Sequence, residues 1–150
     1  MASLLSLLTL LSCGSNKNTQ QDSNDGRKMI HFTYSVQGTM CYGTLYEAKK
    51  DNNKIVVLIN HQEEKDHEYK TGESVFTDLQ TIIDKNKMHK YKGSYSPLFE
   101  ILDGESWSLN VKYEDESMNI TAHGTNAGPG GYREAFREIA DYFNNRFMKK

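Results

Sequence analysis

The sequence predicts an α+β domain in which a single antiparallel sheet of about five strands carries two helices on one face. Two observations lead to this prediction. Five segments have the alternating or continuously apolar pattern of strands, and two longer segments repeat apolar residues at helical spacing. Each helical segment has one apolar stripe, which one face of a sheet would cover. The expected order of elements is β-β-β-α-β-β-α.

The first three strands are expected close together in the sequence. Residues 30–36 alternate apolar and polar side chains, and residues 40–48 are rich in Tyr and Thr. Residues 54–60 form an almost unbroken apolar run, which is typical of a central strand covered on both faces. Asn52 and Asn53 provide the turn before that run, because Asn tolerates a left-handed backbone. Short connections of this kind predict an antiparallel meander.

The first helix is expected from Ser74, a residue type that caps helices well, to about Asn86. Its apolar stripe consists of Val75, Phe76, Leu79, Ile82 and Ile83. Residues 61–68 are charged and predict a solvated loop before this helix. The basic, Tyr-containing segment 87–95 predicts a solvated connection after it, and a further short strand there is an open alternative.

Residues 107–113 alternate Trp107, Leu109, Val111 and Tyr113 with polar side chains, so they predict a strand with one buried face. A hairpin leads to a second strand at residues 118–123, where Met118, Ile120 and Ala122 face one way. The final helix, over residues 132–147, carries an apolar stripe that runs nearly to the last residue. That stripe predicts a packed helix and not a tail.

Residues 3–12 form an uncharged, leucine-rich segment with the length of a signal-peptide apolar region. It ends at Leu10, Ser12 and Cys13, which resemble the lipobox of bacterial lipoproteins, although residues 1–12 contain neither Lys nor Arg. The resemblance implies a diacylglycerol thioether on Cys13 and cleavage before it. Residues 14–28 contain no aliphatic or aromatic side chain, so they predict a flexible tether. The expected organisation is a signal at 1–12, a lipidated Cys and tether at 13–28, and one α+β domain at 29–150.

The C-terminal half also resembles small uncharacterised lipoproteins of Bacteroidetes-type bacteria. The residues that carry this likeness are Asp103, Gly104, Trp107, Gly124, Asn126, Ala127 and Pro129. The resemblance implies a place in the cell envelope, with membrane attachment through the N-terminal lipid. Gly14 and Ser15 follow Cys13 where an inner-membrane retention signal would have Asp, which favours the outer membrane.

The composition argues against a nucleic-acid partner. The formal net charge is -2, so no overall positive field attracts nucleic acid. No cofactor motif is present, and the expectation is a protein without a cofactor. If Cys13 carries lipid, Cys41 has no internal disulfide partner and is expected to be a small buried apolar residue in a strand.

Residues 124–131 form a glycine-rich loop that leads into the final helix. Free backbone N–H groups at a helix N-terminus favour anions, so this loop is the candidate anion or ligand site. Its candidate residues are Gly128, Gly130, Gly131, Tyr132 and Arg133. The alternative is that glycine only allows the chain to reverse sharply there.

The function that the sequence favours is a lipid-anchored binding or interaction module of the cell envelope, since no catalytic or metal-binding motif is evident. A protein partner would favour an aromatic patch on the strands, to which Tyr34, Tyr42 and Tyr46 could contribute. One alternative is a small-ligand or anion-binding domain that uses the glycine loop. Another is a small hydrolase with a His and carboxylate pair, for which His61, His67 and His123 are candidates.

Overall fold

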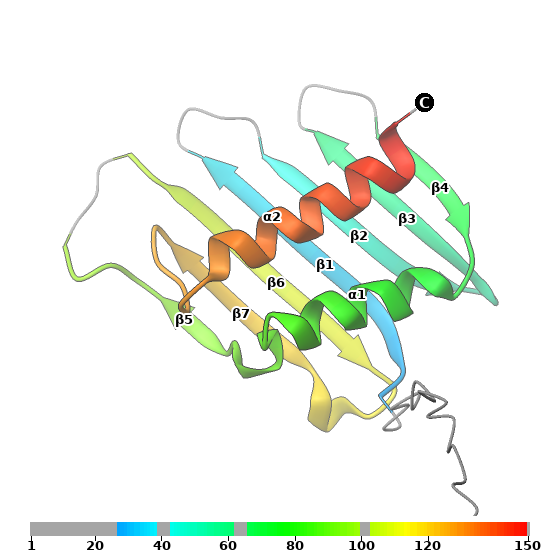
Figure 1. Ribbon diagram of the computed structural model, residues 1–150, viewed down its shortest axis with the longest axis horizontal. Helices are drawn as coiled ribbons and strands as arrows, with labels where there is room; N and C mark the ends of the chain where they lie inside the picture. The colour runs from blue at the N-terminus through cyan, green and yellow to red at the C-terminus, as the bar shows by residue number, and fades with distance from the viewer. Residues whose placement is uncertain (1–26, 39–42, 62–65, 100–102, 150) are drawn as a thin grey trace, which may run out of the picture.

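The computed structural model describes residues 27–38, 43–61, 66–99 and 103–149. They form an α+β fold with one seven-stranded, mostly antiparallel sheet and two helices. The strands are β1 (Met29–Gly38), β2 (Thr44–Asp51), β3 (Lys54–His61), β4 (His67–Thr71), β5 (Gly93–Tyr95), β6 (Glu105–Tyr113) and β7 (Ile120–Thr125). Their spatial order is β4-β3-β2-β1-β6-β7-β5. Figure 1 shows both helices, α1 (Ser74–Lys85) and α2 (Tyr132–Phe143), crossing the same face of the sheet.

The expected sheet of about five antiparallel strands is therefore too small, and it is not wholly antiparallel. Strand β4 pairs antiparallel with β3 at one edge, and three-residue β5 pairs parallel with β7 at the other. Strand β5 lies in segment 87–95, where a further short strand was the open alternative, whereas β4 was not expected. Edge strands are short and need little apolar surface, so their sequence pattern is weak. The loop expected over residues 61–68 is corrected at both ends, since His61 belongs to β3 and His67 begins β4.

The β2–β3 turn confirms the expectation at Asn52 and Asn53, whose φ angles are 45° and 67°. Both residues lie in the left-handed region, which suits the tight hairpin turns that match strand twist. The strand expected at residues 118–123 begins two residues later in the structure, at Ile120. Met118 lies instead in a short 3-10 helix, η2 (Glu116–Met118), and is 36% exposed.

Helix α1 buries the stripe that the sequence predicts, from Val75 to Ile83. Its N-cap is Glu73 and not Ser74, and no side chain caps it. The Ser74 hydroxyl instead accepts a hydrogen bond of 2.7 Å from the Arg146 guanidinium. Helix α2 buries Ala135, Phe136, Ile139 and Phe143 and continues into a short π-helix, η3 (Asn144–Met148), as its long stripe predicts.

The core lies between the two helices and one face of the sheet. Strand residues in this layer alternate with outward residues, as in β6, where Trp107, Leu109, Val111 and Tyr113 are at most 3% exposed. Aromatic rings link the layers, since Phe136 of α2 lies 4.4 Å from the ring of Tyr34 and 4.8 Å from that of Trp107, between centroids. Among the described residues the core contains no buried charged side chain.

Candidate functional site

The glycine loop is shaped first by Trp107. The indole Nε1 of Trp107 donates a hydrogen bond of 2.8 Å to the carbonyl of Ala127, which fixes the loop against β6. A Cβ atom on Gly124 would lie 2.3 Å from that same carbonyl oxygen and 2.7 Å from Nε1. Glycine is therefore required at position 124 by the close approach of the loop to the indole.

The next glycines prepare the start of α2. A Cβ on Gly128 would lie 2.5 Å from Cγ of Tyr132, so this glycine makes room for the tyrosine ring. Gly131 has a φ of 78° and is the N-cap. The amide of Tyr132 donates to the Pro129 carbonyl at 3.0 Å, so one of the donors expected for an anion is already used within the turn.

Arg133 stacks over the ring of Tyr132, with its guanidinium carbon 5.4 Å from the ring centroid. The five candidate residues thus lie together, as neighbours in one turn must, but packing accounts for Gly128 and the left-handed backbone accounts for Gly131. A space for a Cβ remains open only at Gly130 and Gly131 among the three. Anion binding by this loop stays a prediction that rests on the sequence pattern.

The histidines proposed for a hydrolytic or metal site are divided between the two faces of the sheet. His61 and His67 belong to β3 and β4 and share the face that carries the helices, because they keep the phase of buried Ile59. His123 lies on β7 in the opposite phase, between buried Ala122 and Gly124. Within the described parts of the chain, no group of three or more His, Cys, Asp or Glu side chains could hold a metal ion. Cys41 lies outside the described residues, and so does Cys13.

One His and carboxylate pair does form, on β1 and β2. The Nε2 atom of His31 lies 2.7 Å from Oε1 of Glu47 and 3.2 Å from Oγ1 of Thr33. A nucleophile relay needs the hydroxyl on one ring nitrogen and the carboxylate on the other. Here both groups contact the same nitrogen, so the three side chains form a polar contact and not a relay.

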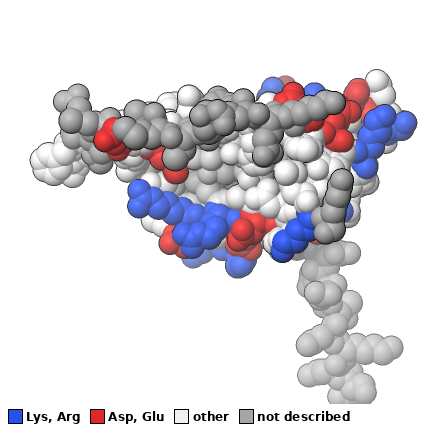
Figure 2. All heavy atoms as spheres, turned by 90° about the horizontal axis from the view of Figure 1, so that it is seen from above, with Lys and Arg blue, Asp and Glu red and all other residues white. Residues whose placement is uncertain are grey.

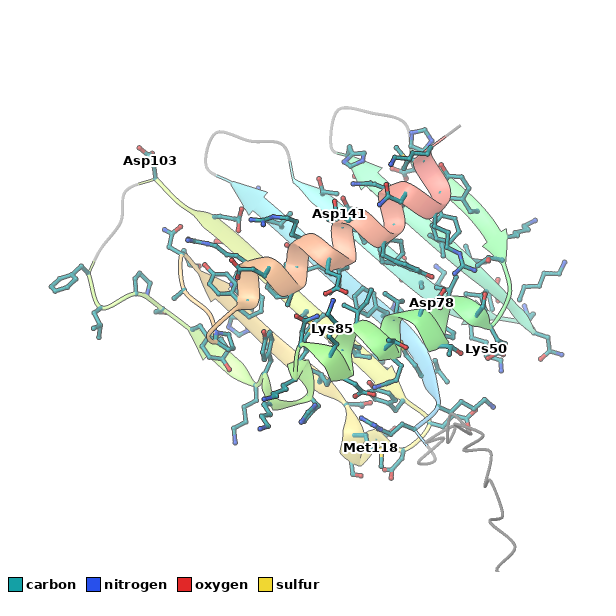
Figure 3. All side chains as sticks on the ribbon, viewed as in Figure 1. Lys50, Asp78, Lys85, Asp103, Met118 and Asp141 are labelled. Carbon is teal, nitrogen blue, oxygen red and sulfur yellow. The ribbon has the colours of Figure 1, made fainter. Side chains whose placement is uncertain are left out.

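A depression lies beside the first described residues, and Arg27, Asp84 and Met118 are among the residues that line it. Arg27 and Asp84 form an ion pair with a 2.9 Å contact. Beside it, Lys28 pairs with Glu114 at 2.7 Å, which lowers the pKa of the Glu114 carboxyl through this hydrogen bond. These two contacts fix the start of β1 to the domain at the end labelled by Met118 in Figure 3.

In the described part of the chain, the second face of the sheet, called the open face below, has no covering helix. Both helices lie on the near side in Figure 1, and none of the described helices covers the far side. On β1, β6 and β7 the open face is lined mostly by small polar side chains, with His31, Lys112 and His123 among them. The small ones include Thr33, Ser35, Ser106, Ser108, Thr121 and Thr125.

The open face changes character on β2, β3 and β4. There it carries the half-buried aliphatic side chains of Leu45, Val56 and Leu58, flanked by acidic and basic residues. Strand pairing aligns Glu68 and Glu47 on either side of Leu58, and Lys70 and Lys49 on either side of Val56. We call these six residues the charged band; the sequence alone did not reveal it, because its members come from three strands.

The expected tyrosine patch was wrong as a binding surface. Tyr34 and Tyr46 are 5% and 4% exposed, and both face the helices. Burial raises the pKa of both phenols above the ordinary value of tyrosine. Tyr42 lies outside the described residues. Tyr34 lies in the same strand phase as buried Phe32, and Tyr46 in the same phase as buried Ala48. That phase is the sequence signal for placing both tyrosines in the core.

No protein-family model matches this chain, and no curated protein matches it. Among the residues that the structure describes, no helix has both the length and the apolar character needed to cross a membrane. Figure 2 shows Lys and Arg side chains along the helix side of the domain, interleaved with acidic ones, so that side offers no field of a single sign.

Proposed function

We propose that this protein is a lipid-anchored binding module of the cell envelope, attached through Cys13 and interacting with a protein partner through the open face. The observation that carries the proposal is a seven-stranded sheet with both described helices on one face. A sheet usually buries one face and can expose the other to water. Here the exposed face is broad and includes three half-buried aliphatic side chains, as expected for a surface that a partner covers part of the time.

The proposed anchor suits the position of the first described residues. Thirteen residues lie between Cys13 and Arg27. A flexible chain of that length has a root-mean-square span of about 20 Å, so the domain would stay close to the membrane surface. The ion pairs of Arg27 and Lys28 hold the domain end of this tether, and the pull of the anchor would act on β1 and α1.

Membrane attachment is tested with Cys13→Ala in the full chain. We expect the variant to leave the washed membrane fraction, because several acyl chains are needed to hold a soluble domain on a bilayer. Cys41→Ala is the matched control, since it also removes one thiol and should stay in the membrane. A Cys13→Ala variant that remains in washed membranes would refute the anchor.

The interaction surface is tested separately by photo-crosslinking in intact cells. A photoreactive amino acid replaces Ser108 on the open face or Arg137 on the outer side of α2, both exposed. We expect a crosslinked protein product from position 108 and none from position 137. Equal products from both positions, or none from position 108, would count against the open face.

A further inference from the structure

The charged band has an order that a random polar surface would lack. Across β4, β3 and β2, one row reads Glu68, Leu58, Glu47, and the next row reads Lys70, Val56, Lys49. All six side chains belong to the open face, because they alternate along their strands with residues turned toward the helices. An acidic row therefore lies directly beside a basic row, and each has an aliphatic residue at its centre.

This order is complementary to itself under one symmetry operation. A two-fold axis lying between the rows, parallel to them and perpendicular to the strands, places the acidic row of one copy opposite the basic row of the other. Glu68 would then face Lys70 of a second copy, and Leu58 would face Val56. A two-fold axis along the strands would instead place each row opposite itself, which brings like charges together. Homodimers most often use a two-fold axis with the same patch on both partners.

We infer that the partner of the open face is a second copy of this chain, packed sheet against sheet through the charged band. This inference rests on the open face being the interaction surface proposed above, and it names the occupant. The Glu68 and Lys70 side chains are exposed on edge strand β4, and neither forms an ion pair within the described residues. Each is thus available to an opposing chain, whereas Glu47 and Lys49 on β2 already lie within 4.0 Å of each other.

The area of the face suits a weak, concentration-dependent dimer. The axis crosses β7 at Ile120, where that strand begins, so β7 and β5 lie on one side of it and do not overlap with their copies. The other five strands, spaced about 4.8 Å apart with roughly 20 Å of shared length, present about 480 Å² per copy, or about 1,000 Å² for the pair. Stable protein interfaces bury about 1,200–2,000 Å² in total, and weak or transient ones bury less. Face-to-face packing also suits twisted sheets, because two aligned sheets pack about 10 Å apart with their strand directions within about 30° of each other.

The arrangement is compatible with two lipid anchors in one membrane. The symmetry axis crosses β1 between His31 and Thr33, about three residues from Met29. The two β1 strands run in opposite directions, so their starts lie roughly 20 Å apart along the strands at about 3.3 Å per residue. Tethers with a span of about 20 Å allow both copies to reach the same bilayer.

The test uses the full chain with Cys13→Ala, kept reduced, in sedimentation analysis at low salt, where exposed charges are least screened. We expect a concentration-dependent dimer. Glu68→Lys alone, and Lys70→Glu alone, should each raise the dissociation constant of the dimer by about 10-fold or more, because symmetry introduces every like-charge contact twice. The double variant Glu68→Lys/Lys70→Glu exchanges the two signs, restores the pairing and should return the constant to near its original value.

Arg137→Glu is the matched control, because it reverses an exposed charge on the helix side. It should leave the dimer unchanged. A chain that stays monomeric at every accessible concentration would overturn the inference, as would a dimer that ignores Glu68→Lys or a double variant as weak as the single ones. None of these results affects the membrane-fraction test of Cys13 or the crosslinking test, so the failure of this inference is distinguishable from the failure of the proposed function.

Discussion

The two faces of the sheet are made from the same strands but have different roles. On β6, Trp107, Leu109 and Val111 lie under the helices and are at most 3% exposed. Between them, Ser108 is exposed and Asn110 is half-buried on the open face. Burial of apolar area is the main favourable term in folding, so the covered face holds most of the stabilising free energy. Substitutions on the open face should therefore change binding and leave folding nearly intact.

The largest effect is expected for Trp107→Ala. The indole is 3% exposed, contacts Phe136 and donates its hydrogen bond to Ala127, so truncation leaves both a cavity and an unpaired carbonyl. We expect a loss of about 3–5 kcal/mol in the free energy of unfolding, measured by chemical denaturation. Asn110→Ala on the same strand should cost less than about 0.5 kcal/mol. Similar losses for the two variants would contradict the division of roles between the faces.

A smaller loss is expected for Gly124→Ala. The added Cβ would lie 2.3 Å from the Ala127 carbonyl, so the loop or the indole must move. Overpacking of this kind costs about 1–3 kcal/mol. Gly130→Ala is the control in the same loop, because nothing lies within 4 Å of its Cβ position. Thermal unfolding should separate the two variants, and equal melting temperatures would show that the loop is not fixed by Trp107.

Much of the covered face could be predicted from sequence, because the buried apolar residues recur periodically along each segment. The stripe from Val75 to Ile83 and the alternation from Trp107 to Tyr113 each identify an element and its inner side. Strand β5 has only three residues, which are too few to show such a pattern. In β4, Glu68 and Lys70 alternate with residues that are only half-buried, so the apolar pattern is weak. Their places depend on pairing with distant strands, which a local pattern does not contain.

The open face was less predictable for a related reason. Sequence alternation says that Glu47, Val56 and Glu68 point away from the core, but it does not say which of them are neighbours. Only the register of β2, β3 and β4 brings acidic side chains into one row and basic ones into the next. Aromatic residues were favoured as partner contacts because they are common in interfaces, yet Tyr34 follows the phase of Phe32 into the core.

The smallest predicted effect concerns a charge pair on the helix side, which contrasts with the charged band. Lys85 of α1, labelled in Figure 3, donates to Glu138 of α2 at 2.7 Å, and Asn86 donates to the same carboxylate at 3.0 Å. These hydrogen bonds, first that from Lys85, lower the pKa of the Glu138 carboxyl. A lowered pKa in the folded state stabilises the fold above the ordinary pKa of glutamate, and this contribution is lost as the pH falls through the lowered value.

Glu138→Gln should therefore reduce the free energy of unfolding at neutral pH by less than about 1 kcal/mol, since the pair is partly exposed, and the difference from the original chain should vanish in strong acid. Denaturant titrations at neutral pH and in strong acid measure this difference in the free energy of unfolding. Lys85→Met is expected to behave in the same way. Glu68→Gln on the open face is the control, measured where the chain is monomeric, and should change folding at neither pH. If Glu68→Gln lowered the free energy of unfolding as much as Glu138→Gln, charges on the open face would also stabilise the fold. The charged band would then have a role in folding as well as in binding a partner.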